Sequence, residues 1–172
     1  MKDRQPKHRQ AARERARLDR RTASRAGLPT ALIVCEGRCT EPYYLGGLLE
    51  HLGVNAANAH IQTGSYKTDA LSLVRDARAR FRSTPEYDHV FVVLDGDQAH
   101  LDEARREAGK GMAKAGGGRV TVELIVTSPC FEYWLLLHFD YTRAAFVAAG
   151  KNSAGDAALA ALKRYWPDYG KG

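Results

Sequence analysis

Short hydrophobic runs alternate along the chain with longer stretches in which hydrophobic residues recur every three or four positions. The runs at 31–35 and 89–94 are continuously apolar, which is typical of strands covered on both faces in a parallel sheet. A weaker run at 60–63 and a run at 120–126, alternating and then wholly apolar, predict two further strands. Strands that alternate with helices are typical of an α/β protein. We therefore predict a Rossmann-like fold, with a mostly parallel four-stranded sheet flanked by helices.

The stretches between these runs have the hydrophobic period of amphipathic helices. The predicted helices cover residues 40–52, 68–82, 99–115, 130–139 and 155–165. In the first helix we expect Leu52 to face inward, whereas in the second we expect Arg78 to face solvent. Gly116–Gly118 would end the third helix, because glycine is common just after helix ends. We expect Trp134 and His138 to be core residues, because the fourth helix is strongly apolar.

The basic residues are concentrated at one end of the chain. Among 172 residues, 26 are Lys or Arg and 20 are Asp or Glu, which gives a formal net charge of +6. Residues 1–26 contain ten basic and three acidic residues, so this segment carries +7 and the remainder of the chain carries −1. A chain of this length normally forms one domain. We predict a basic arm over 1–27 and a near-neutral α/β domain over 28–172.

The predicted arm has too few hydrophobic residues to form a core, and we expect it to be disordered or helical when free. Arg9, Arg13, Arg17 and Arg21 recur four positions apart. A helix would place these four guanidinium groups on one face, where they suit the phosphate backbone of a nucleic acid. A solvated tail that aids solubility is the alternative interpretation.

The sequence favours a cytoplasmic protein. No run approaches the ~18 apolar residues of a membrane-spanning helix, and the first residues lack the apolar run of a signal peptide. The three cysteines are Cys35, Cys39 and Cys130, and this small, odd number suits a reducing compartment better than a disulfide scaffold. Cys35 and Cys39 lack the second close pair that a zinc site would need.

Acidic residues follow the predicted strands directly. Glu36 comes after the first strand, Asp95 and Asp97 come after the third, and Glu132 lies in the first turn of the helix after the fourth. The carboxyl ends of parallel strands share one edge of a sheet, which is where ligands bind in such folds. We therefore expect these four carboxylates to converge on one crevice.

Such a cluster needs a cation, because neighbouring carboxylates raise one another's pKa. Mg²⁺ (or Mn²⁺) takes oxygen ligands, and the alternation of strand side chains puts Asp95 and Asp97 on the same side. We expect Gly37 and Gly96 to leave room for a phosphate near the backbone. Solvated carboxylates are the alternative, and Asp97 alone can be explained as a helix cap.

Two basic residues outside the arm are candidate substrate ligands. Arg38 follows Glu36-Gly37 and places a positive charge at the mouth of the expected site. Lys67 lies in the loop at 64–68, which precedes a helix and can hold a phosphate at the helix N-terminus. An ordinary loop is an equally good interpretation of this segment.

Four motifs resemble the RloB-like family. They are Ala31-Leu-Ile-Val-Cys-Glu-Gly37, Thr40-Glu-Pro-x-Tyr44, Leu94-Asp-x-Asp97 and Ser128-Pro-Cys-Phe-Glu-x-Trp-Leu-Leu136. The last is the most specific, and the resemblance extends over residues 20 to 170. Members of the family usually continue with further helical sequence beyond the segment that matches residues 165–171.

The RloB-like family is similar to Toprim-domain proteins, whose Rossmann-like core carries a Glu after one strand and Asp-x-Asp after another. Toprim proteins include topoisomerases, primases and overcoming-lysogenisation-defect nucleases. The resemblance implies a Toprim-like core here, with Glu36, Asp95 and Asp97 at the matching positions. It also implies a place in prokaryotic anti-phage or restriction-associated loci, often beside an AAA-type ATPase.

Three functions follow as hypotheses. The first is a Mg²⁺-dependent phosphodiesterase of Toprim type, a nuclease in phage defence, in which Asp95, Asp97 and Glu132 hold the metal. In it, Glu36 acts as general acid or base, or as ligand to a second ion. The second is a non-catalytic nucleic-acid- or nucleotide-binding module that works with a partner ATPase and needs no metal. A haloacid-dehalogenase-type phosphatase fits poorly, because its nucleophilic Asp-x-Asp follows the first strand and precedes Thr or Val, whereas Gln98 stands here.

Overall fold

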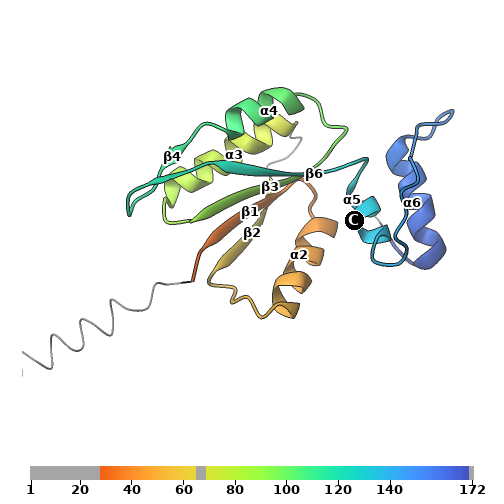
Figure 1. Ribbon diagram of the computed structural model, residues 1–172, viewed down its shortest axis with the longest axis horizontal. Coiled ribbons are helices and arrows are strands. Elements are labelled where there is room, and N and C mark those ends of the chain that lie inside the picture. The colour runs from red at the N-terminus through yellow and green to blue at the C-terminus, as the bar shows by residue number, and fades with distance from the viewer. Residues whose placement is uncertain (1–27, 65–68, 171–172) are drawn as a thin grey trace, which may run out of the picture.

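A four-stranded sheet forms the centre of the molecule (Figure 1). The computed structural model describes residues 28–64 and 69–170. The strands of this sheet are β1 (Ala31–Cys35), β2 (Ala59–Thr63), β3 (His89–Asp95) and β6 (Val122–Thr127), in the order β2-β1-β3-β6. Each neighbouring pair is parallel. The predicted Rossmann-like α/β fold is therefore confirmed.

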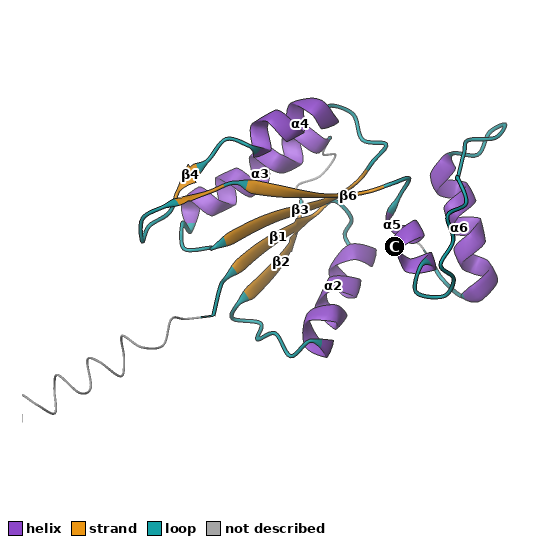
Figure 2. Cartoon of the chain, viewed as in Figure 1, coloured by secondary structure: helices purple, strands orange, loops and turns teal. Residues whose placement is uncertain are grey.

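Helices cover both faces of this sheet and produce three layers (Figure 2). The helices α3 (Ala70–Ser83) and α4 (Leu101–Ala108) pack on one face. On the other face lie α2 (Thr40–His51) and α5 (Phe131–Leu136), and α6 (Ala154–Tyr165) packs against α5. Within the described ranges, no helix is long and apolar enough to cross a membrane.

Side chains of β1 alternate between two hydrophobic cores. Leu32 and Val34 pack in the core formed with α3 and α4, whereas Ile33 and Cys35 pack in the core that includes residues of α2, α5 and α6. Successive side chains of a strand point to opposite faces. A strand with a helical layer on each side is therefore apolar at every position, which explains the continuous run in the sequence.

The expected exposure of Arg78 on α3 is wrong, because its side chain is almost fully buried between α3 and α4 (6% exposed). Its Nε lies 3.1 Å from a carboxylate oxygen of Glu107. Its Nη1 donates hydrogen bonds to the backbone carbonyls of Glu107 and Lys110 at the end of α4. The long side chain thus joins α3 to the last turn of α4 and to the residue Lys110 that follows it.

The predicted helix over 99–115 is too long. The chain leaves α4 early and forms an antiparallel hairpin of β4 (Met112–Ala113) and β5 (Arg119–Val120). Gly117 and Gly118 have φ angles of 91° and 86°, in the left-handed region that favours glycine. The three consecutive glycines therefore turn a hairpin, instead of ending a helix.

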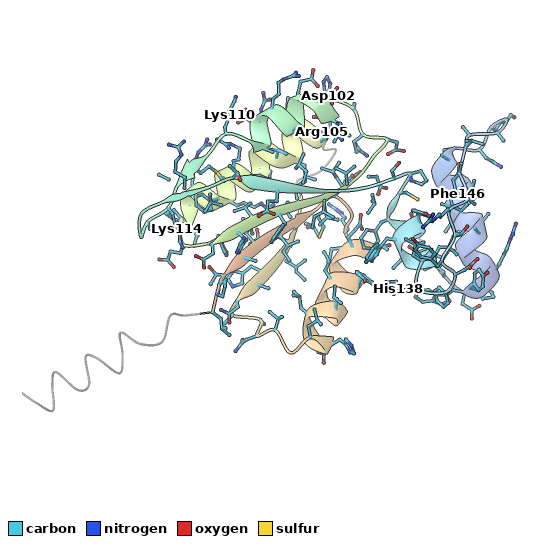
Figure 3. The ribbon with its side chains drawn as sticks, in the orientation of Figure 1. Asp102, Arg105, Lys110, Lys114, His138 and Phe146 are labelled. Carbon is cyan, nitrogen blue, oxygen red and sulfur yellow. The ribbon has the colours of Figure 1, made fainter. Side chains whose placement is uncertain are left out.

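The predicted core positions of Leu52, Trp134 and His138 are also wrong, since all three side chains are exposed. Leu52 follows the last residue of α2. Trp134 and His138 lie beside Tyr44: the Trp134 and Tyr44 ring centroids are 6.4 Å apart, and the Tyr44 hydroxyl lies 3.0 Å from His138 Nε2. His138 follows the short helix α5 (Figure 3). In that helix Phe131, Leu135 and Leu136 are buried, whereas Trp134 is exposed.

Candidate functional site

The ends of β1 and β3 bring the first two carboxylates together. In the parallel register Cys35 lies opposite Val93, so both strands finish at the same edge of the sheet. Glu36 Oε2 accepts a hydrogen bond from the backbone N–H of Asp95 at 3.0 Å. Its Oε1 accepts a second from Gln98 Nε2 at 2.6 Å. The Glu36 side chain therefore crosses from the end of one strand to the end of the next.

Asp95 makes the corresponding connection from β3 to β6 and α5. Its Oδ1 accepts hydrogen bonds from Thr127 Oγ1 and from the backbone N–H of Phe131, each at 2.9 Å. Phe131 is the first residue of α5, so this N–H has no partner within its own helix. The Asp95 carboxylate thus satisfies the beginning of α5 and fixes the helix at the sheet edge.

Glu132 is brought to the same edge by α5. Its side chain is 1% exposed, which makes it one of the most deeply buried charged groups in the described structure. Tyr169 donates its hydroxyl hydrogen to Glu132 Oε1 at 3.1 Å, and the same hydroxyl lies 3.1 Å from Thr40 Oγ1. The end of the described chain therefore covers the Glu132 carboxylate and connects it to the first residue of α2.

A further carboxylate, Glu41, lies over the turn after β1. It is buried in the first turn of α2, and a Cβ placed on Gly37 would lie only 2.0 Å from Glu41 Oε2. The space expected beside Gly37 for a phosphate is therefore filled by Glu41. The corresponding space beside Gly96 is also restricted, since a Cβ there would lie 3.1 Å from the carbonyl oxygen of Thr127.

These groups line one cleft of about 150 Å³ at the carboxyl edge of the sheet. We call it the carboxylate cleft. Its lining residues are Glu36, Gly37, Arg38, Thr40, Glu41, Asp95, Phe131 and Glu132. Four carboxylates and a single cation thus surround a volume large enough for a few water molecules or a phosphate-sized group.

Burial and, to a smaller extent, nearby negative charges raise the pKa values of groups in and beside the cleft. Burial, together with the charges of Asp95, Glu41 and Asp97, raises the pKa of Glu36 to about 7 against the opposing hydrogen bond from the Asp95 N–H. Burial and the Glu41 charge raise the pKa of Cys35 to about 12. Burial and the neighbouring Glu132 do the same for the pKa of Cys130. Both thiols are held protonated, so neither is suited to act as a nucleophile.

The donor chemistry of the cleft fits a hard divalent cation, because every anionic group that lines it offers carboxylate oxygens. Glu36, Asp95 and Glu132 are the residues that could hold such an ion. Their side chains do not form a ready-made ligand set: within residues 28–64 and 69–170 there is no group of three His, Cys, Asp or Glu side chains arranged to hold a metal. Binding a cation here would therefore require the carboxylates to rotate toward it.

Comparison with known protein families gives a significant match. The model of the family described as RloB-like protein matches residues 31–172. The chain belongs to the RloB-like family. No curated protein and no solved structure matches it significantly. The matched region includes every element of this RloB-like domain, from β1 to α6.

The structure of this RloB-like chain brings together four of the predicted site residues. Glu36, Asp95, Glu132 and Arg38 all line the carboxylate cleft. Asp97 is exposed and does not line it, although its charge contributes to the raised pKa of Glu36. Asp97 is not the cap of α4 either, since α4 begins after His100. Convergence from three chain segments is therefore observed, with Asp97 at the periphery.

The remaining predicted ligands of this RloB-like protein lie outside the described residues. These are Lys67 in the loop before α3, and Arg9, Arg13, Arg17 and Arg21 in the basic arm. Their expected contacts with phosphate stay predictions, as does the division of the chain into an arm over 1–27 and a domain over 28–172.

Sequence reasoning missed Glu41, Gln98 and Tyr169 as members of the site. For Glu41 a signal was present, because an acidic residue in the first turn of a helix interacts favourably with the helix dipole. Gln98 directly follows Asp97, so the argument that placed residues after strand ends at one edge of the sheet could have included it. Tyr169 had no local signal, because its partner Thr40 is 129 residues away along the chain.

Proposed function

We propose that this RloB-like protein is a Mg²⁺- or Mn²⁺-dependent phosphodiesterase of Toprim type that acts on nucleic acid in the cytoplasm. The observation that carries the proposal is the convergence of Glu36, Asp95 and Glu132, from three separate segments, on one cleft at the carboxyl edge of a parallel sheet. Ligands of open α/β sheets bind at this edge. The resemblance of the family to Toprim proteins, with Glu after one strand and Asp-x-Asp after another, points to the same chemistry.

In this proposal Asp95 and Glu132 are the principal metal ligands, and Asp97 binds from the periphery. The bound cation would neutralise the carboxylates and stabilise charge on the phosphate oxygens. Glu36 is suited to proton transfer, because a carboxyl group whose pKa is about 7 is populated in both protonation states at neutral pH. Its hydrogen bonds from the Asp95 N–H and Gln98 hold it in one orientation. Arg38 lines the cleft and supplies the positive charge that orients a phosphodiester.

The biological setting that we propose is anti-phage defence, together with an AAA-type ATPase encoded at the same locus. This part rests on the family resemblance alone. The basic arm would add sequence-independent affinity for nucleic acid, since its Lys and Arg residues can neutralise phosphates.

Cleavage assays with an active-site variant and a surface variant test the activity. Wild-type protein, Asp95→Asn and Asp102→Asn would be incubated with plasmid, single-stranded DNA and RNA, with and without Mg²⁺ or Mn²⁺. Asp102 is a matched control, because it is an exposed carboxylate on α4, on the other face of the sheet from α2 (Figure 3). We expect metal-dependent cleavage by the wild type and by Asp102→Asn. Asp95→Asn should lose more than ~100-fold, since metal ions supply several kcal/mol of transition-state stabilisation.

A non-catalytic nucleic-acid- or nucleotide-binding module is the second candidate. It is favoured by the absence, within the described residues, of three metal-binding side chains already arranged around one point. The same assays separate the two candidates. If the wild type cleaves none of the substrates, both alone and with the neighbouring ATPase, the binding module is the better interpretation.

A further inference from the structure

A second and larger cavity lies directly beside the carboxylate cleft. Its volume is about 510 Å³, within the range of small-molecule sites. It is formed between α2 and the last described residues of the chain, which lie near each other in Figure 1. Four aromatic side chains line it: Tyr43, Tyr44, Trp166 and Tyr169. We call this space the aromatic pocket.

The aromatic pocket and the carboxylate cleft share a wall. Thr40 lines both spaces. Tyr169 lines the aromatic pocket, while its hydroxyl reaches through the wall to Thr40 Oγ1 and donates to Glu132. The two spaces are therefore adjacent, and the side chains of Thr40 and Tyr169 lie between them.

Some aromatic rings of the pocket pack against other rings, and some remain exposed to a ligand. Tyr44 packs edge-on against Phe131 with centroids 5.5 Å apart, and the Trp166 and Tyr169 centroids are 5.2 Å apart. Tyr43 remains 76% exposed and Trp166 45% exposed, although both line the pocket. Asp168 adds an exposed carboxylate, which can accept hydrogen bonds from N–H groups.

We propose that the aromatic pocket binds a nucleobase of the strand whose phosphodiester lies in the carboxylate cleft, an inference that rests on the proposed function. Bases stack on aromatic side chains without requiring a particular sequence. A base also carries ring or exocyclic N–H groups, which Asp168 can accept, whereas an aliphatic ligand has no use for this carboxylate. The pocket thereby positions the strand next to the cleft, and Tyr169 couples base binding to the orientation of Glu132.

The two tryptophans of the chain provide a matched pair of fluorescent reporters. Trp166 lines the pocket and is 45% exposed, whereas Trp134 does not line it and is 44% exposed. In the full-length Trp134→Phe variant Trp166 is the only tryptophan, and in Trp166→Phe Trp134 is the only tryptophan. Each variant would be titrated with a trinucleotide of deoxyadenosine and with the same trinucleotide made abasic, without divalent cations and at a salt concentration that screens phosphate contacts.

We expect the trinucleotide with bases to quench Trp166 and the abasic trinucleotide to leave it unchanged. Trp134 should respond less than Trp166, because it contacts the pocket only through Tyr44. In the Trp134→Phe background, Tyr43→Ala should weaken binding by about 5- to 150-fold, the range for loss of one base–aromatic stack. Tyr141→Ala is the matched control, because Tyr141 has the same exposed fraction of 76% and does not line the pocket. It should bind as the parent does.

Three results would overturn the inference: an equal response to both trinucleotides, no response of Trp166, or equal weakening by Tyr43→Ala and Tyr141→Ala. Concentration-dependent self-association that Tyr43→Ala abolishes would also overturn it, since the occupant would then be a second copy of the chain. Because the titration contains no metal and measures no cleavage, its failure is distinguishable from failure of the phosphodiesterase, which the Asp95→Asn assay tests.

Discussion

Glu36 combines two properties that normally oppose each other. It accepts hydrogen bonds from the Asp95 N–H and from Gln98, which favour its charged form. Its pKa is nevertheless raised to about 7, because burial and the charges of Asp95, Glu41 and Asp97 outweigh the hydrogen bond from the Asp95 N–H. The charged form of Glu36 is therefore present at neutral pH only at a cost to the folded state.

This cost predicts an unusual pH dependence of stability. From about pH 4.5, the ordinary value, to about pH 7, the folded state keeps a proton on Glu36 that the unfolded state releases. The folded state binds more protons, so its stability falls as the pH rises through this window. Allowing for solvent screening of a half-buried group, wild type should lose about 1–2 kcal/mol more than Glu36→Gln between pH 5 and 8.

Urea unfolding at several pH values measures this difference. Glu50→Gln is the control, since Glu50 is an exposed carboxylate on α2, and it should follow the wild-type curve. Parallel curves for wild type and Glu36→Gln would show that Glu36 titrates normally and would contradict the prediction.

At the scale of residues, the sequence predicted three carboxylates of the cleft but missed the tyrosine that covers one of them. Glu36, Asp95 and Glu132 were accessible because strand direction alone decides where a strand end lies. Tyr169 was not, because only the packing of α6 on α5 brings the end of the chain back to Thr40. The raised pKa of Glu36 could not be predicted from the sequence either, since it depends partly on Glu41, which fills the space beside Gly37.

At the scale of elements, α3 and α4 are joined through one buried guanidinium group. Arg78 pairs with Glu107 and donates to two carbonyls at the end of α4. Arg78→Met should lower the free energy of unfolding by about 1–2 kcal/mol, because it removes the ion pair and two hydrogen bonds of a buried guanidinium group, while Glu107 keeps its ion pair with Lys110. Arg82→Met, on the exposed side of the same helix, should change it by less than ~0.5 kcal/mol.

Chemical denaturation of the two variants measures their free energies of unfolding. A loss in Arg78→Met no greater than in Arg82→Met would show that the ion pair contributes little. The sequence could not distinguish these two arginines, because both follow the polar period of the helix. The burial of Arg78 depends on where α4 ends, and the apolar pattern that continued to residue 115 concealed this end.

The strands were predicted more accurately than the helix ends. A strand covered on both faces must be apolar at each position, so β1 and β3 were visible as continuous runs. Helix ends depend on local backbone geometry, and at α4 they also depend on the β4–β5 hairpin that follows. Short hairpin strands of two residues have no periodicity that a sequence can show.

At the scale of the whole molecule, the excess positive charge and the carboxylate cleft lie in different parts of the chain. The segment of residues 1–26 carries +7 and the remainder −1, although only part of the chain is described by the structure. A deletion of residues 1–26 should therefore weaken nucleic-acid binding while leaving the carboxylate cleft intact. If four arginines contact phosphates, the slope of log affinity against log salt should decrease by about 3 to 4.

Fluorescence anisotropy with a labelled oligonucleotide at several salt concentrations measures this slope. Binding of Mn²⁺ to the truncated protein, followed by calorimetry, serves as the control for an intact cleft. Equal affinities of the full-length and truncated proteins at low salt would contradict the role of the arm.

The hydroxyl of Tyr169 has a consequence for synthesis on the ribosome. Thr40 and Tyr169 meet at 3.1 Å but are separated by 129 residues, which are made roughly 6 to 26 s apart at ordinary rates of translation. When Glu132 has been made, Glu36 and Asp95 are already present, but the tyrosine that covers Glu132 is still 37 residues away. A nascent chain therefore has its carboxylates without the complete cover of Glu132 until Tyr169 has been made.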